Sequence, residues 1–284
     1  MAVSDQVTPA PAGRAPVPRA PIGLERTGDE LASFGAAVEF GATTFRGIWS
    51  GRILQYLNEV LRQASTLVTG SLLVVLGLVF ALGLEIGIES SYTAQSVGAP
   101  AVAGAIAALA DLREIIPYAF GYMMAAKVST GYVAEIGTMR ITEEIDALEV
   151  MGMDSHVYLC STRLLGMWLV LPFIYMISIA VAFIGSYIAV VLQVATTSSG
   201  GYFELFWKFQ TPADYLFSGI KGMVMATFVV LVGCFYGYRV RGGPADVGRA
   251  TAKAMIINLV GVHFIGILGS QLFWGGSPRL PIGG

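Results

Sequence analysis

The sequence predicts an all-α membrane protein, in which an N-terminal interfacial helix precedes five transmembrane helices. Of the 284 residues, 55% are hydrophobic and only 13% are charged, whereas soluble domains carry roughly 25% charged residues. The apolar residues fall into five blocks, and a helix of about 20 apolar residues crosses the roughly 30 Å of bilayer hydrocarbon. Glycine is frequent, at 35 residues, which suits close packing of transmembrane helices.

The chain begins with a segment that has no apolar core. Residues 1–27 are rich in proline and arginine, so we expect a disordered tail and no signal peptide. Over residues 28–63 apolar side chains recur near helical spacing among charges and glycines. A surface helix of a soluble domain would look similar, but no soluble domain follows. We therefore expect an interfacial amphipathic helix here.

The five apolar blocks define a membrane domain over residues 64–275, with a short tail at 276–284. Thr66–Ile86 is the first span. The second block is broken, because charged residues and a proline separate Gly98–Ala110 from Ile115–Val133. One interrupted helix and a re-entrant piece followed by a span both fit this pattern. The remaining spans are expected at Leu164–Val194, Leu216–Tyr238 and Ala254–Trp274.

The distribution of Lys and Arg predicts the topology. Basic residues gather before Thr66 and in the loop 239–253, whereas the loop 195–215 contains only Lys208. The positive-inside rule places the first two regions in the cytoplasm. With five crossings, the segment 134–154 is then cytoplasmic as well, and the C-terminus is external.

The segment 134–154 contains six acidic residues and only one basic residue, Arg140. Such a cluster cannot lie in hydrocarbon. Thr142 followed by Glu143 and Glu144 is typical of a helix start, with a hydroxyl cap and acids in the first turn. The expected helix has an apolar stripe made of Ile141, Ile145, Leu148 and Met151 or Met153. It also has an acidic edge made of Glu143, Asp146 and Glu149, with no basic residue at helical spacing to pair with them. A solvated loop helix, which composition alone favours, and a docking helix for a partner both fit.

Five ionisable residues fall at or near membrane depth: Asp111, Arg113, Glu114, Lys127 and Lys221. Each costs at least ~2.5 kcal/mol there, so each needs a partner or a wet cavity. One interpretation is an internal ion pair that joins Arg113 or Lys221 to Glu114 or Asp111. The other is a polar patch that lines a cavity and meets an anionic headgroup. Lys127 lies nearer the cytoplasmic end, where a snorkelling side chain is sufficient.

Several function classes lose support from absent motifs. The chain has no G-x-x-x-x-G-K-[ST] motif, so it cannot hold nucleotide phosphates in a P-loop. It has no H-E-x-x-H motif and only two histidines, which predicts no metal site and no catalytic residues. The sequence has no basic patch that would indicate binding of nucleic acid. A secondary transporter would show paired broken helices, and only one interrupted segment is visible. An assembly scaffold without transport activity also fits.

The residues 135–152, EIGTMRITEEIDALEVMG, resemble the signature of the MlaE/YrbE permease family. These permeases are the membrane subunits of ABC-type lipid transporters that work with MCE-domain proteins. Residues 112–117 resemble the family's Arg-Glu-Leu-Gly-Pro motif, 219–222 its Ile-Lys-Ser element, and 237–251 its last cytoplasmic loop. The similarity extends over about residues 30–275. Departures such as Glu144 in place of Gln resemble B-type YrbE paralogues of actinobacterial Mce systems.

The resemblance implies that 135–153 is a coupling helix seated in a groove of a P-loop ATPase dimer at the cytoplasmic face. The implied coupling residues are Glu135, Met139, Arg140, Glu143, Glu144, Ile145, Asp146, Leu148 and Glu149. It also favours a lipid cavity that contains Arg113, Glu114 and Lys221.

The same resemblance implies a transport subunit rather than an enzyme, with an MlaE-like fold. The chain itself is expected to bind no cofactor, and ATP and Mg would be held by the partner ATPase. The implied partners are a second, paralogous YrbE-type permease, MCE-domain proteins outside the membrane, and membrane lipid. The implied activity is import of fatty acids, sterols or other lipids across the inner (plasma) membrane.

Overall fold

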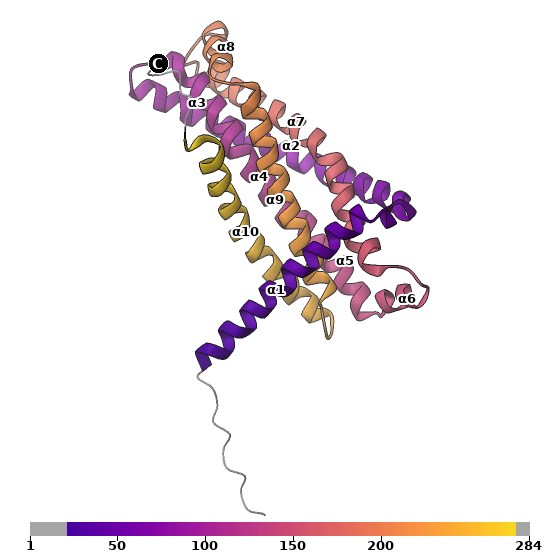
Figure 1. Cartoon of the computed structure of the whole chain (residues 1–284). Helices are drawn as coiled ribbons and strands as arrows, with labels where there is room; N and C mark the ends of the chain where they lie inside the picture. The colour runs from indigo at the N-terminus through magenta and orange to yellow at the C-terminus, as the bar shows by residue number, and fades with distance from the viewer. Residues whose placement is uncertain (1–21, 277–284) are drawn as a thin grey trace, which may run out of the picture. The chain divides into compact units, whose positions relative to one another are not determined.

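The computed structural model describes residues 22–276, with side chains from residue 32, and within this range its regular structure is entirely helical (Figure 1). The all-α prediction is confirmed for these residues. The tail expected at the C-terminus and most of the tail expected at 1–27 lie outside them. Residues up to Glu39 and residues from Phe40 onward form two separate compact units. The second unit contains all the helices discussed as membrane spans.

The first helix, α1 (Ile22–Trp49), begins earlier and ends earlier than the expected interfacial helix. Its first turns fall in the segment that we expected to be disordered. It ends before Gly51, whose φ of 73° is the left-handed conformation that glycine adopts at little cost. A 3₁₀ turn, η1 (Arg52–Tyr56), then leads into α2 (Leu57–Ser96). The pattern over 28–63 therefore belongs to three elements rather than one.

The interrupted second block is a continuous helix over residues 103–141, not a re-entrant piece. After a 3₁₀ turn, η2 (Pro100–Val102), its parts are α3 (Ala103–Ala110), η3 (Asp111–Ile115), α4 (Ile116–Met123), η4 (Met124–Ser129) and α5 (Thr130–Ile141). Both η3 and η4 are π-helical segments. Pro117 is the second residue after η3, and it lacks the N–H that would pair with the carbonyl of Arg113 in an α-helical register. The wider π turn accommodates the proline ring without ending the helix.

The remaining helices complete the bundle: α6 (Glu144–Val150), η5 (Val157–Ser161), α7 (Thr162–Tyr187), η6 (Ile188–Gln193), α8 (Ser199–Lys208), α9 (Pro212–Tyr238) and α10 (Pro244–Trp274). Four stretches are long and apolar enough to cross a membrane: Arg52–Ser96, Val157–Gln193, Pro212–Tyr238 and Pro244–Trp274. These four stretches overlap four of the five expected spans. The remaining expected span lies in the helix 103–141, which is not among the four. The helix α8 falls within residues 195–215, where a loop was expected and no helix was predicted.

Within this bundle α9 is central and α10 is peripheral. The helix α9 contacts α4, α5, α7 and α10, while α2 packs along α7. In the most apolar stretch of each helix, 44% of α9 is buried but only 17% of α10. The contact of α2 with α7 depends on small residues, since a Cβ on Gly185 would lie 2.5 Å from the carbonyl oxygen of Phe80. Close approach of this kind explains part of the high glycine content.

Candidate functional site

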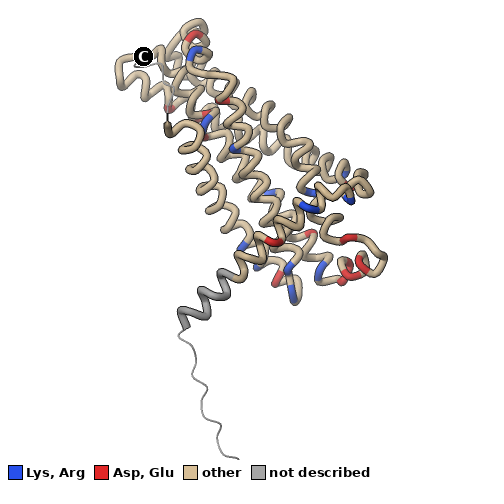
Figure 2. Tube along the Cα trace, viewed as in Figure 1, with Lys and Arg blue, Asp and Glu red and all other residues tan. Residues whose placement is uncertain are grey.

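The acidic segment 134–154 gathers at one end of the bundle, on and around α6 (Figure 2). It is not the single helix predicted for 135–153. The helix α5 continues to Ile141, the chain turns through Glu143 at a φ of 60°, and α6 starts afresh at Glu144. Thr142 was expected to cap this helix, and that prediction is wrong. Its hydroxyl instead donates to the Thr138 carbonyl at 3.0 Å, at the end of α5.

The apolar stripe of α6 attaches the helix to its own bundle. Ile145 is fully buried, and Leu148 and Met139 pack against the main hydrophobic core. A short amphipathic helix is stabilised mainly by such packing. The apolar side chains that stay available to a partner lie at the other end of α6, where Val150 is 89% and Met151 68% exposed.

The expectation of an unpaired acidic edge is also partly wrong. Arg140 Nη1 lies 2.8 Å from Asp146 Oδ1. Glu149 Oε1 accepts hydrogen bonds from the Ser155 hydroxyl at 2.6 Å and the Tyr238 hydroxyl at 3.3 Å. Residues 140 and 146 would not meet on one straight helix, but the turn at Glu143 folds them together. Glu143 and Glu144 are exposed, as are Asp146 and Glu149, and the Glu144 carboxylate lies 2.9 Å from the Thr142 hydroxyl.

Glu135 was predicted as a coupling residue, and it also joins α5 to α7. Its carboxylate lies 2.7 Å from the Nη2 atom of Arg163, a residue that is only 1% exposed. Arg163 also donates to the Leu159 carbonyl at 2.6 Å and lies over the ring of Tyr132. A buried guanidinium needs such a partner. Arg163 was not predictable as a buried partner, because it stands at the start of an apolar run and nothing there indicates burial.

His156 links the start of η5 to the last turns of α1. Its Nε2 atom is 2.9 Å from the Thr44 hydroxyl, and the ring of Phe40 packs edge-on at 4.5 Å. Because Thr44 donates its only hydroxyl proton to the Phe40 carbonyl, His156 is the donor through Nε2–H. Burial lowers the pKa of His156, although nearby Asp154 opposes the shift. The neutral ring is therefore the form that stabilises this junction.

Because of the contact between His156 and Thr44, we expect the folded protein to lose stability in acid. The folded pKa lies below the unfolded value of about 6.5, so the unfolded chain binds the proton more readily. The contribution is complete above about pH 6.5 and is lost as the pH falls through the folded pKa. We expect the melting temperature to fall more steeply between about pH 7.5 and 5.5 in the wild type than in His156→Gln, which keeps a donor but cannot titrate. Equal slopes would contradict this assignment.

The three predicted cavity residues meet at the far end of the same helix 103–141. Lys221 from α9 is 1% exposed, and its Nζ atom donates to Glu114 Oε2 at 2.8 Å and to Ser270 at 2.7 Å. It also donates to the Arg113 carbonyl at 2.9 Å. Pro117 has no N–H to offer this carbonyl in an α-helical register, or the Leu112 carbonyl in the π register of η3. The helix α9 supplies a donor to each of them, from Lys221 to Arg113 and from the Ser218 hydroxyl to Leu112.

Arg113 pairs with an acid that the sequence analysis did not single out. Its Nη2 atom lies 3.2 Å from Asp214 Oδ1. Asp214 is fully buried and also accepts hydrogen bonds from Thr211 and from the Trp274 indole. The run Thr-Pro-Ala-Asp at 211–214 is a capping pattern that predicts a helix start, and this was its only signal.

Asp111 takes no part in these pairs. It is fully buried, and neither carboxylate oxygen has a hydrogen-bond partner among the described residues. The suggested ion pair of Asp111 with Arg113 or Lys221 is therefore wrong.

The polar cluster, defined as Arg113, Glu114, Asp214 and Lys221, balances two cations with two acids. Glu114 is its outward-facing member, with 42% of its side chain exposed. It lines an open groove of about 370 Å³ together with Tyr118, Ser270, Gln271 and Trp274. The geometry favours internal ion pairing for Lys221, because its ammonium group is enclosed by protein acceptors.

Comparison with known proteins agrees with the earlier resemblance at the level of the family. Residues 60–272 match the family model described as Permease MlaE. A "Probable ABC transporter permease protein" of Rickettsia bellii is 27% identical over 219 residues, which cover 77% of this chain and 84% of that protein. One from Synechocystis is 26% identical over 186 residues, 66% of this chain and 70% of that protein. "Protein TRIGALACTOSYLDIACYLGLYCEROL 1, chloroplastic" of Arabidopsis thaliana is 28% identical over 174 residues, 61% of this chain and 49% of that protein. The chain therefore belongs to the MlaE family of ABC transporter permeases, the transport subunits of systems whose ATPase is a separate subunit.

Proposed function

We propose that this chain is the permease subunit of an ATP-driven lipid transporter, and that a separate P-loop ATPase pushes on the surface of α6. The observation that carries the proposal is the construction of α6: exposed acids and apolar side chains on a helix that is tied rigidly to several spans. The lipid cargo is supported by the relative in Arabidopsis, which is named for the lipid trigalactosyldiacylglycerol.

The ties of α6 offer a route for mechanical force. Arg140 connects Asp146 to the end of α5, and Tyr238 connects Glu149 to the end of α9. Ile145 is buried in the core beneath them. A push on α6 would therefore move the ends of two spans together, rather than bend a loose loop.

The continuous helix 103–141 connects the region of α6 to the polar cluster. From Glu135 to Glu114 the helical path covers 21 residues, or roughly 32 Å at 1.5 Å per residue. Two π segments, η3 and η4, interrupt its regular hydrogen bonding, and such segments are frequent at functional sites. We infer that tilting of α5 would be felt at η3, where Arg113 and Glu114 lie.

A second permease subunit would complete the cavity. The apolar face of α10 is mostly uncovered, and the groove beside Glu114 opens between η3, α4 and α10. We infer that a paralogous permease packs here and encloses a lipid cavity. MCE-domain proteins outside the inner membrane would deliver lipids such as fatty acids or sterols to it for import, with the N-terminus and α6 in the cytoplasm and the C-terminus outside.

The proposal is tested by reversing two exposed acids together, as Glu143→Arg/Glu144→Arg, in the complete complex. We expect ATPase association or lipid uptake to fall at least about tenfold. An ATPase surface that receives these acids would be basic, so the introduced arginines would face like charges. Such a contact costs more than the ~1.4 kcal/mol that a tenfold change represents. Copurification of the ATPase, ATP hydrolysis and lipid uptake are the measurements.

The matched control is Glu89→Arg/Glu204→Arg, which reverses two exposed acids on α2 and α8. This control should keep the ATPase bound. If the α6 variant also keeps the ATPase and full uptake, α6 is not the coupling surface. Uptake that depends on a proton gradient and on no ATPase would instead indicate a secondary transporter.

A further inference from the structure

Asp111 is a buried acid that the ion pairs of the bundle leave without a counter-charge. It lies fully buried at the start of η3, and neither carboxylate oxygen has a hydrogen-bond partner among the described residues. The polar cluster, which begins two residues further on at Arg113, already balances its two cations with two acids. An ionised Asp111 would therefore add an uncompensated negative charge to the interior of a membrane protein.

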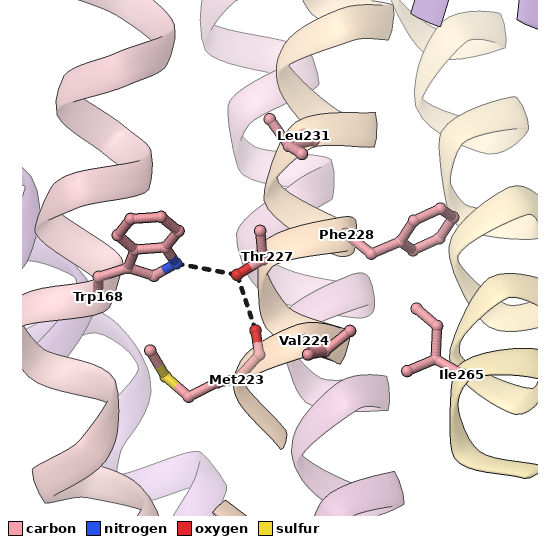
Figure 3. Close-up of a pocket in the computed structure, with 7 residues that line it drawn as sticks. All are labelled: Trp168, Met223, Val224, Thr227, Phe228, Leu231 and Ile265. Atoms are coloured by element: carbon pink, nitrogen blue, oxygen red, sulfur yellow. Dashed lines mark hydrogen bonds between the residues drawn. The ribbon is translucent and has the colours of Figure 1, made fainter. Parts of the chain in front are cut away.

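Polar side chains elsewhere between the spans pair with one another. In the pocket between α7, α9 and α10, the Trp168 indole donates to the Thr227 hydroxyl at 2.9 Å, and that hydroxyl donates to the Met223 carbonyl at 2.8 Å (Figure 3). Among the buried side chains that the structure describes, Asp111 is the one with no polar atom in a hydrogen bond. Buried polar groups are rarely left in this state.

The described helices around this site supply no further cation. The helix α7 has no charged residue between Leu164 and Gln193, and α10 has none after Lys253. Gly87 of α2 packs directly against Ser186 of α7. The other charged side chains at this end of the bundle belong to the polar cluster or are exposed on the surface, namely Glu85 and Glu89 of α2 and Glu204 and Lys208 of α8.

The hydroxyl groups next to Asp111 offer it an acceptor rather than a donor. Ser186 of α7 and Tyr202 of α8 both lie near its carboxyl group, and their oxygens are 3.1 Å apart. Ser186 donates its only proton to the Phe183 carbonyl, also at 3.1 Å, so Tyr202 is the donor in the bond between the two hydroxyls. The Ser186 oxygen keeps one lone pair, and only a donor can use it.

The surroundings of Tyr202 are apolar and closely packed. Tyr202 is 1% exposed and lies in a hydrophobic cluster with Val190 and Phe206. A Cβ on Gly104 would lie 2.8 Å from the Tyr202 carbonyl oxygen, so α3 and α8 approach each other closely. In such surroundings an unpaired charge is costly, whereas a neutral hydrogen bond is strengthened.

We propose that Asp111 is a proton-binding site, in which the carboxyl group is held as the neutral acid and donates a hydrogen bond to Ser186. A buried carboxyl group without a cation takes up a proton rather than stay charged. The proton supplies the donor that the Ser186 oxygen lacks. It thereby links η3 to α7 and, through Tyr202, to α8, and it fixes the turn of helix that carries Arg113 and Glu114.

The test is isotope-edited infrared spectroscopy of the full-length chain in its complex, with a heavy carbon isotope in the aspartate carboxyl groups. A protonated aspartic acid gives a carbonyl stretch above the amide bands, and the isotope shifts it. At about pH 7, where an ordinary aspartate is ionised, we expect such a band in the wild type and its loss in Asp111→Asn. Absence of the band from the wild type would mean that Asp111 is ionised and holds a water molecule or a metal cation, and would overturn the proposal.

The matched control is Asp214→Asn, because Asp214 is equally buried but is paired with Arg113. This variant should keep the band. If the band disappears in Asp214→Asn rather than in Asp111→Asn, the proton resides on the wrong acid for the proposal. Asp146→Asn, which changes an exposed acid paired with Arg140, provides the same control without altering the polar cluster.

The hydrogen bond is tested with Ser186→Ala, which removes the acceptor. The acid band should then move to a higher wavenumber, because a carboxylic acid absorbs at higher energy when it loses a hydrogen bond. The control is Ser178→Ala, another buried serine of α7, whose hydroxyl donates to the Ile174 carbonyl at 2.8 Å. It should leave the band where it is. An unmoved band in Ser186→Ala would show that Asp111 does not donate to Ser186. These readouts need neither ATP nor lipid uptake, so they can fail while the proposed transport function stands.

Discussion

Replacing Glu114 with alanine is expected to destabilise this permease by about 3 kcal/mol, the lower end of the range for breaking a buried ion pair, because Glu114 is itself partly exposed. The reason is the ammonium group of Lys221, whose side chain is fully buried. Without Glu114 it would keep only the neutral acceptors Ser270 and the Arg113 carbonyl. Lys221→Met should cost less, since the carboxylate that it leaves behind can reach water in the groove.

Thermal unfolding in detergent or nanodiscs measures the difference between these variants. For a chain of this size, about 3 kcal/mol corresponds to a fall of about 6–12 °C in melting temperature. The double variant Glu114→Ala/Lys221→Met removes both charges and should melt closer to the wild type than Glu114→Ala does. If the effects of the two single variants simply add in the double variant, the residues do not act as a pair. Lipid uptake by the stable double variant then shows whether the charges serve transport as well.

Replacing Glu135 with alanine is expected to be as damaging, again by about 3 kcal/mol because Glu135 is itself partly exposed, since the change leaves the almost completely buried Arg163 without a counter-charge. Arg163→Lys should also be poorly tolerated. A lysine has no planar fork with which to reach both Glu135 and the Leu159 carbonyl. Since this pair joins α5 to α7, we further expect ATP hydrolysis to persist in the complex while lipid uptake falls.

The control for this pair is Arg163→Met, which removes the buried charge and keeps an apolar stem. It should be more stable than Glu135→Ala, and melting curves of the two variants decide the order. A Glu135→Ala protein that melts like the wild type would contradict the ion pair. If uptake and ATP hydrolysis fall in parallel in every variant, the pair stabilises the fold without transmitting force.

The membrane class of the fold was predictable because it depends on composition and on the length of apolar runs. Spans such as Leu216–Tyr238 need only enough apolar residues to cross hydrocarbon. Both α9 and α10 end at the expected residues, although α10 begins at Pro244 rather than at Ala254. The choice between one broken helix and a re-entrant piece was not predictable. It depends on whether another helix satisfies the backbone near Pro117, and Lys221, far away in sequence, does so.

The partners of the charged residues were not predictable for the same reason. The sequence identified Arg113, Glu114 and Lys221 as charges that need a partner in the membrane. It did not identify Asp214, because a helix-capping acid and a buried counter-ion have the same local pattern. At α6, the acidic residues were correctly placed outside the spans. Their pairing with Arg140 and Tyr238 was missed, because a straight helix was assumed where Glu143 adopts a left-handed turn.

The sequence by itself determined that this chain is a helical membrane permease of the MlaE family, because apolar runs and motifs are local properties of the chain. Only the tertiary structure decided which charges lie inside, which acids still face a partner, and which buried acid lacks a counter-charge. Those properties depend on contacts between helices, such as Lys221 with Glu114 or Arg163 with Glu135, and burial by another helix leaves no trace in the local pattern of residues.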